Sequence, residues 1–133
     1  MRDVKLYAPE SYWEADPKVR AVVTGGCGPG KLGDWLVPDT LYGLSVRPAC
    51  EIHDWMYAVG DTLSDKEEAD RVFLNNMCRI IDANTSWGFL RWLRKRRAKK
   101  YYYAVKLFGG TSFWNDKNES RNFRQLSVLE EWV

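Results

Sequence analysis

His53 is the only histidine in the chain, and it stands next to Asp54 with Tyr57 four residues further on. On a helix, His53 and Tyr57 would share a face, whereas His53 and Asp54 would diverge by about 100°. This divergence suits two separate tasks. The imidazole can take a proton from water, while the carboxylate binds a cation that draws electrons from an ester carbonyl.

A catalytic imidazole needs a partner on its second nitrogen, which fixes its tautomer and its orientation. Asp70 is the candidate, because it stands next to Ala69 and three residues before Phe73 among the apolar positions of the second predicted helix, where a carboxylate is costly to bury without a hydrogen-bonding partner. Tyr57 is expected to help hold it. Two other interpretations remain open: His53 is an ordinary core residue, or Asp70 pairs with Arg71 or Arg79.

Residues 25–39 contain five glycines and two prolines, so regular structure is not expected there. Residues 25–31 match the start of a phosphate-binding loop, but Leu32 stands where that loop needs Ser or Thr. Calcium prefers oxygen ligands, often backbone carbonyls with one carboxylate. The loop and Asp54 are therefore a candidate calcium site, and an ordinary surface loop is the alternative. A zinc site is excluded by the single histidine and the lack of C-x-x-C spacing.

The spacing of apolar residues predicts a helix around the histidine. Ser45 is a candidate N-cap, Pro48 suits the first turn, and Gly60 ends the helix. Residues 1–24 are predicted to form an irregular arm that ends in a strand-like run at 21–24.

Two further helices are expected after this one. The second begins at Ser64, which forms a capping box with Glu67, and extends to a break at 84–88. The third spans about residues 89–107 and ends at a pair of glycines. In the tail, residues 126–132 are predicted to form a short helix.

The length of 133 residues suits a single domain, and the 45% content of hydrophobic residues is far from that of a disordered chain. Neither a signal peptide nor an apolar segment long enough to span a membrane is visible. Three cysteines are an odd number, so at most one bridge forms within the chain. The sequence does not indicate an oligomeric state.

The combination resembles the phospholipase A2 superfamily. The signature of that family is a C-G-x-G calcium loop, a helix with C-x-x-H-D-x-x-Y and a second helix with an aspartate, which appear here at residues 27–30, 50–57 and 70. The resemblance implies an all-α fold with two packed core helices and a glycine-rich calcium loop, covering about residues 25–81. The basic helical extension at about 89–107 and the tail at 110–133 complete one domain.

The resemblance implies calcium-dependent hydrolysis of a glycerophospholipid ester at the sn-2 position. In this role His53 is the general base, Asp70 and Tyr57 support it, and the amide of Gly28 is an oxyanion donor. The implied calcium ligands are the carbonyls of three loop glycines and the carboxylate of an aspartate: Gly26, Gly28, Gly30 and Asp54.

The resemblance also implies a disulfide between Cys27 and Cys50, with two reduced thiols as the alternative. Other cysteines of the family are missing, among them the one at Ala49. Residues 69–73 and 103–109 look like a group of bacteriophage and prophage proteins that share the H-D-x-x-Y core. A secreted or virion-associated location is expected if the disulfide forms, and a cytoplasmic one otherwise. A non-catalytic phage structural or assembly protein on the same scaffold is the alternative function.

The positive charge of the chain is concentrated in residues 91–100, which hold seven basic and no acidic side chains. This run is expected to contact a phospholipid membrane, where each basic group near an anionic surface contributes about 1 kcal/mol. A nucleic-acid-binding module is the competing interpretation, and a solvated helix face or a subunit contact is the third. The expected contact residues are Arg91, Trp92, Arg94, Lys95, Arg96, Arg97, Lys99 and Lys100.

Overall fold

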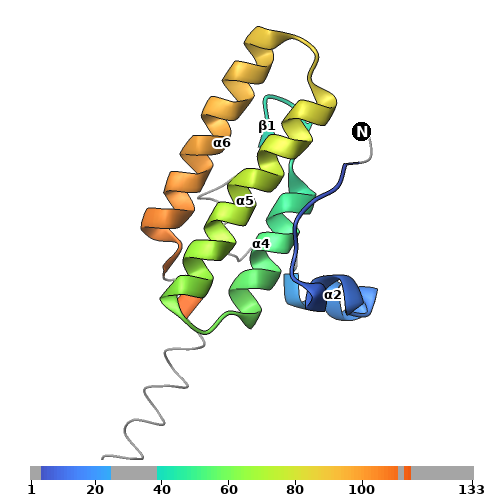
Figure 1. The fold of residues 1–133 in the computed structure, drawn as a ribbon, viewed down its shortest axis with the longest axis vertical. Helices are drawn as coiled ribbons and strands as arrows, with labels where there is room; N and C mark the ends of the chain where they lie inside the picture. Colours follow the sequence, from blue (N-terminus) through green and yellow to red (C-terminus); the bar gives the residue numbers. More distant parts are fainter. Residues whose placement is uncertain (1–3, 25–38, 111–112, 115–133) are drawn as a thin grey trace, which may run out of the picture.

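The computed structural model describes residues 4–24, 39–110 and 113–114. Three helices, α4 (Arg47–Val59), α5 (Leu63–Asn84) and α6 (Gly88–Phe108), dominate this part of the chain. In Figure 1, α5 lies between α4 and α6 and packs against both. The described part is mostly helical, which confirms the all-α class. None of its helices is both long and apolar enough to cross a membrane.

The core lies between these three helices and is rich in apolar side chains of α5. Phe73, Met77, Ile80 and Ile81 of α5 are all at most 1% exposed. They pack in one cluster with buried side chains of α4 and α6, among them Ala49, Ala98, Tyr101 and Val105.

The boundaries of α4 follow the expected signals closely. Pro48 lies in the first turn, and Gly60 is the C-cap, whose N–H donates to the carbonyl of Met56. The prediction of Ser45 as N-cap is wrong, because the N-cap position is Val46; Ser45 instead accepts a hydrogen bond from the backbone N–H of Arg47 at 3.3 Å.

The capping box of α5 lies two residues before the predicted one. Thr62, and not Ser64, is the N-cap: its hydroxyl accepts from the N–H of Asp65, while the carboxylate of Asp65 accepts from the N–H of Thr62, both at 3.1 Å. Ser64 and Glu67 lie inside the helix. The break predicted before the third helix is confirmed, because α5 ends at Asn84 and α6 begins at Gly88.

The N-terminal segment is helical in two short pieces, α1 (Glu10–Glu14) and α2 (Pro17–Thr24). The irregular arm predicted for residues 1–24 is therefore wrong from Glu10 onward, and so is the strand-like run at 21–24. Asp16 starts α2, since its carboxylate accepts from the N–H of Lys18 at 2.8 Å, and Pro17 suits a first helical position. These terminal signals outweigh the β-branched valines. Helix α2 packs against α4.

A two-stranded antiparallel hairpin precedes α4 and pairs β1 (Thr40–Leu41) with β2 (Leu44–Ser45). Its two turn residues, Tyr42 and Gly43, both have positive φ, at 49° and 83°. This conformation is typical of a type I′ turn and is unusual for a tyrosine.

Candidate active site

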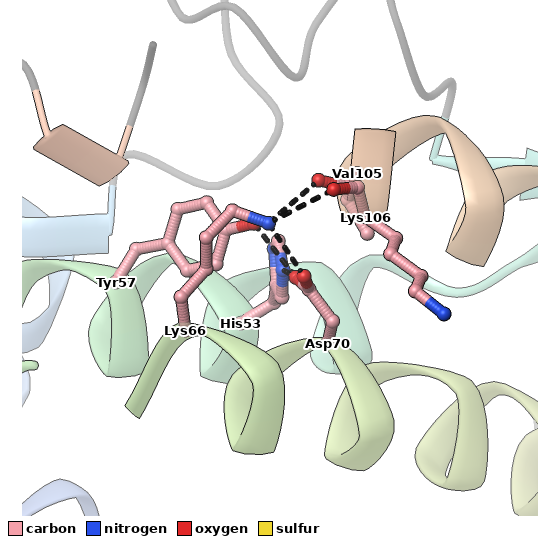
Figure 2. Close-up of polar contacts among 6 residues, drawn as sticks. All are labelled: His53, Tyr57, Lys66, Asp70, Val105 and Lys106. Atoms are coloured by element: carbon pink, nitrogen blue, oxygen red, sulfur yellow. Dashed lines mark hydrogen bonds and ion pairs between the residues drawn. The ribbon is translucent and has the colours of Figure 1, made fainter. Parts of the chain in front are cut away.

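Asp70 lies at the centre of a buried polar cluster between α4 and α5. Its side chain is 2% exposed, and its Oδ1 atom is 2.8 Å from Nε2 of His53 and 2.7 Å from the hydroxyl of Tyr57 (Figure 2). His53 and Tyr57 both come from α4, where their spacing of four residues turns them toward α5. The structure thus brings together the three residues that the sequence proposed for general-base chemistry. The two arginines considered as alternative partners of Asp70 bond elsewhere. Arg71 donates to Glu68, and Arg79 donates to Asn75 and to the carbonyl of Lys5.

The contact with Asp70 fixes which nitrogen of His53 carries the proton. A carboxylate only accepts hydrogen bonds, so Nε2–H donates to it, and Nδ1 is left with its lone pair. Burial lowers the pKa of His53 below 6.5, and the nearby Lys66 cation lowers it as well, against the opposing effect of Asp70. The imidazole is therefore neutral at neutral pH, which is the form that a general base requires.

Aromatic rings hold the imidazole of His53 in place. The ring of Phe73 stacks on it with centroids 4.6 Å apart, and the ring of Tyr57 lies 4.1 Å away at a tilt of 46°. Burial, followed by the charge of Asp70, raises the pKa of Tyr57 far above its ordinary value, so the phenol stays protonated and donates. Gly109 covers this phenol closely, since a Cβ atom there would lie 2.6 Å from the hydroxyl oxygen.

Lys66 completes the cluster and was not predicted from the sequence. Its Nζ atom is 2.8 Å from Oδ2 of Asp70 and also donates to the carbonyls of Val105 at 3.0 Å and Lys106 at 3.3 Å (Figure 2). The spacing of four residues between Lys66 and Asp70 on one helix was a usable signal for this pair. The carbonyl partners at the end of α6 carry no signal in the sequence.

These donors determine the charge state of Asp70. Burial by itself would raise the pKa of the carboxyl group, but hydrogen bonds from His53, Lys66 and Tyr57 outweigh it, and the pKa lies below 3.8. Asp70 is thus a buried anion with three donors directed at its two oxygens.

Of the predicted calcium ligands, Asp54 is the one that lies within the described residues. This half-buried residue lies on α4 next to His53, and its Oδ2 atom is buried. A carboxylate oxygen is a donor that suits calcium. The remaining predicted ligands, Gly26, Gly28 and Gly30, lie outside the described residues, as does Cys27 of the predicted disulfide; Cys50 is buried in α4. Within the described ranges, no group of three or more His, Cys, Asp or Glu side chains is arranged to hold a metal ion.

Four of the eight α6 residues that were predicted to contact a membrane or nucleic acid form hydrogen bonds or ion pairs within the protein. Arg94 donates to the carbonyls of Leu41 and Tyr42, and Arg97 donates to the hydroxyl of Tyr42. Lys95 and Arg91 lie 2.9 and 3.6 Å from the carboxylate of Asp82. The exposed members of the predicted set are Trp92, Arg96, Lys99 and Lys100.

Three aromatic residues extend this exposed surface at the start of α6. Trp87, Phe89 and Trp92 are 65%, 56% and 54% exposed, and their rings contact one another in sequence order. The guanidinium of Arg96 lies over the ring of Trp92 at 5.4 Å. We call these four residues, together with Lys99 and Lys100, the outer face of α6.

Comparison with known proteins adds no family assignment: no family model matches the chain, and no curated protein or solved structure shows significant similarity to it.

Proposed function

We propose that this protein is a calcium-dependent esterase of the phospholipase A2 type, which hydrolyses a glycerophospholipid ester with water activated by His53. The observation that carries the proposal is the bond between Nε2 of His53 and the buried carboxylate of Asp70. It leaves a neutral imidazole with one unprotonated nitrogen, Nδ1, whose orientation is set by groups from two helices.

In the proposed mechanism, Nδ1 of His53 takes a proton from water as the oxygen attacks the ester carbonyl. The resulting imidazolium is stabilised by the Asp70 anion, which Tyr57 and Lys66 hold in place. When the ester bond breaks, the proton on Nδ1 passes to the departing alkoxide, which leaves a free alcohol and a fatty acid. The neutral imidazole is then restored.

The calcium requirement of the proposal comes from the family resemblance. The residues that would hold the ion are Asp54 and the carbonyls of Gly26, Gly28 and Gly30, with the amide of Gly28 as an oxyanion donor. When bound, calcium would polarise the ester carbonyl.

The partner proposed for the outer face of α6 is an anionic phospholipid surface. Exposed aromatic rings suit the boundary between headgroups and acyl chains, and exposed basic groups are attracted to anionic headgroups. The three contacting aromatics favour lipid over nucleic acid, whose backbone requires only the basic groups. Binding to anionic and to neutral vesicles, with double-stranded DNA as the competitor, tests this choice.

The proposed activity is tested by the release of a labelled sn-2 fatty acid from mixed phosphatidylcholine and phosphatidylglycerol vesicles. Release should require calcium, stop with EGTA, and fall by at least about 1,000-fold in His53→Gln, because general-base catalysis and water orientation are lost together. Glu14→Gln, an exposed change on α1, should keep full activity. Wild-type protein without turnover, but bound to vesicles or to other chains, would instead favour the non-catalytic assembly role.

A further inference from the structure

Lys66 is a buried cation whose contacts are fully accounted for. It is 5% exposed, and its ammonium group has three acceptors within 3.3 Å: Oδ2 of Asp70 and the carbonyls of Val105 and Lys106. An ammonium has three N–H donors, so each acceptor can take one. Removing a cation from water is costly, and the carboxylate together with the two carbonyl acceptors offsets this desolvation cost.

The two oxygens of Asp70 have different partners. Oδ1 accepts from His53 and Tyr57, and Oδ2 accepts from Lys66 (Figure 2). Rotation about the bond to a carboxylate is soft, so the imidazole contact by itself does not fix the plane of the group. A donor on the second oxygen does, because turning the carboxylate would break the bond to Lys66.

The position of Lys66 is itself set by another helix. The carbonyls of Val105 and Lys106 belong to the last turn of α6, where the helix dipole places partial negative charge, and the carbonyl of Val105 also accepts from the N–H of Gly109 at 2.8 Å. The cation therefore joins the end of α6 to the carboxylate that orients His53.

We propose that Lys66 is a positioning residue for the His53 and Asp70 pair: it locks the Asp70 carboxylate against the end of α6 and thereby keeps the proton of His53 on Nε2. Its catalytic consequence rests on the proposed esterase function. Its effect on the imidazole does not, because the contacts are present whether or not an ester is hydrolysed.

The test compares Lys66→Met, which keeps the length of the side chain but removes the charge, with Lys66→Arg, which keeps the charge. Lys18→Met is the matched control, since Lys18 is an exposed lysine on α2. Because the chain has one histidine, the ¹⁵N shifts of its imidazole report the tautomer without overlap. Spectra are taken at a pH where the ring is neutral.

The wild type and Lys18→Met should show the Nε2–H tautomer, and Lys66→Met should show a mixture with Nδ1–H. In the vesicle assay, kcat of Lys66→Met should fall by about 10- to 100-fold, as for other partners that orient a functional histidine, with KM changed less than about twofold. Lys66→Arg should recover part of kcat and the wild-type tautomer. A folded Lys66→Met with wild-type tautomer and kcat would overturn the proposal.

Two further outcomes also decide for or against the proposal. If Lys66→Met does not fold, the double variant Lys66→Met/Asp70→Asn should be more stable, because the loss of stability then comes from an unpaired buried carboxylate. A double variant that is no more stable than Lys66→Met would overturn the proposal. If the wild type shows no turnover but Lys66→Met changes the tautomer, the esterase function fails and the positioning role stands.

Discussion

Replacing Tyr57 by phenylalanine removes one hydroxyl from the buried cluster and keeps the ring. That hydroxyl donates to Oδ1 of Asp70 at 2.7 Å, and the side chain of Asp70 is 2% exposed, so water has little access to replace it. A hydrogen bond to a charged group contributes about 1.5–3 kcal/mol. We therefore expect Tyr57→Phe to lower the free energy of unfolding by about 2 kcal/mol at neutral pH.

The pH dependence of this loss has a definite sign. The folded chain holds the pKa of Asp70 below 3.8 despite burial, because His53, Lys66 and Tyr57 stabilise the anion. A depressed carboxyl pKa contributes stability that is present above the unfolded pKa and is lost as the pH falls through the folded one. The difference between Tyr57→Phe and the wild type should accordingly shrink once the pH falls below about 4.

Urea unfolding followed by tryptophan fluorescence measures both quantities. Tyr103→Phe is the matched control, because Tyr103 is 55% exposed and loss of its hydroxyl should change stability by less than about 0.5 kcal/mol. A loss of the same size in the two variants would refute the assignment of the Tyr57 bond as a buried, charge-assisted one. So would a loss that grows in acid.

Three further predictions concern other parts of the chain. Asn76→Leu should lower the free energy of unfolding by about 2–3 kcal/mol in urea, because the buried amide donates to the carbonyl of Tyr7 and accepts from its N–H, both at 2.8 Å; a smaller change than in an exposed Asn75→Leu control would contradict it. Stability should fall as the pH drops below about 6.5, because burial lowers the pKa of His53 and the unfolded chain binds the extra proton; an equally steep fall in His53→Gln would assign it to other groups. Millimolar calcium should raise the melting temperature of the wild type but not of Asp54→Asn, and equal shifts in scanning calorimetry would locate the ion elsewhere.

The sequence was sufficient for the residues of α4 and α5 that meet at Asp70. Helical spacing turns His53 and Tyr57 to one side, and it places Asp70 on the apolar face of its helix, where a carboxylate needs a partner. It was not sufficient for the acceptors of Lys66, since backbone carbonyls at the end of α6 have no residue-type signature. The start of α5 was placed two residues late because two capping patterns overlap, and only the three-dimensional structure shows that Thr62 is the one used.

The contacts of the basic run at residues 91–100 could likewise be predicted only in part from the sequence. A cluster of arginines and lysines predicts positive charge, but it does not reveal which of them have partners distant in the sequence. Arg94 reaches carbonyls of the hairpin more than fifty residues away, and Arg97 lies over the ring of Tyr42 at 4.8 Å. These two residues stabilise a turn with positive φ at a tyrosine. Loss of lipid binding in an Arg94 variant would therefore have to be separated from loss of the hairpin.

The buried pair of Lys66 and Asp70 is hard to explain by stability alone. Replacing a buried ion pair by apolar side chains of similar volume is often neutral or stabilising, because the desolvation cost of both charges disappears. The double variant Lys66→Met/Asp70→Leu should consequently unfold at a higher urea concentration than either single variant, because each single change leaves one charge buried without its partner. It should still unfold at a lower urea concentration than the wild type, since the hydroxyl of Tyr57 and the Nε2–H of His53 lose their acceptor. A double variant that is stable but has lost the Nε2–H tautomer of His53 would separate the two roles of the pair. It would show that the pair orients the imidazole without being needed for folding.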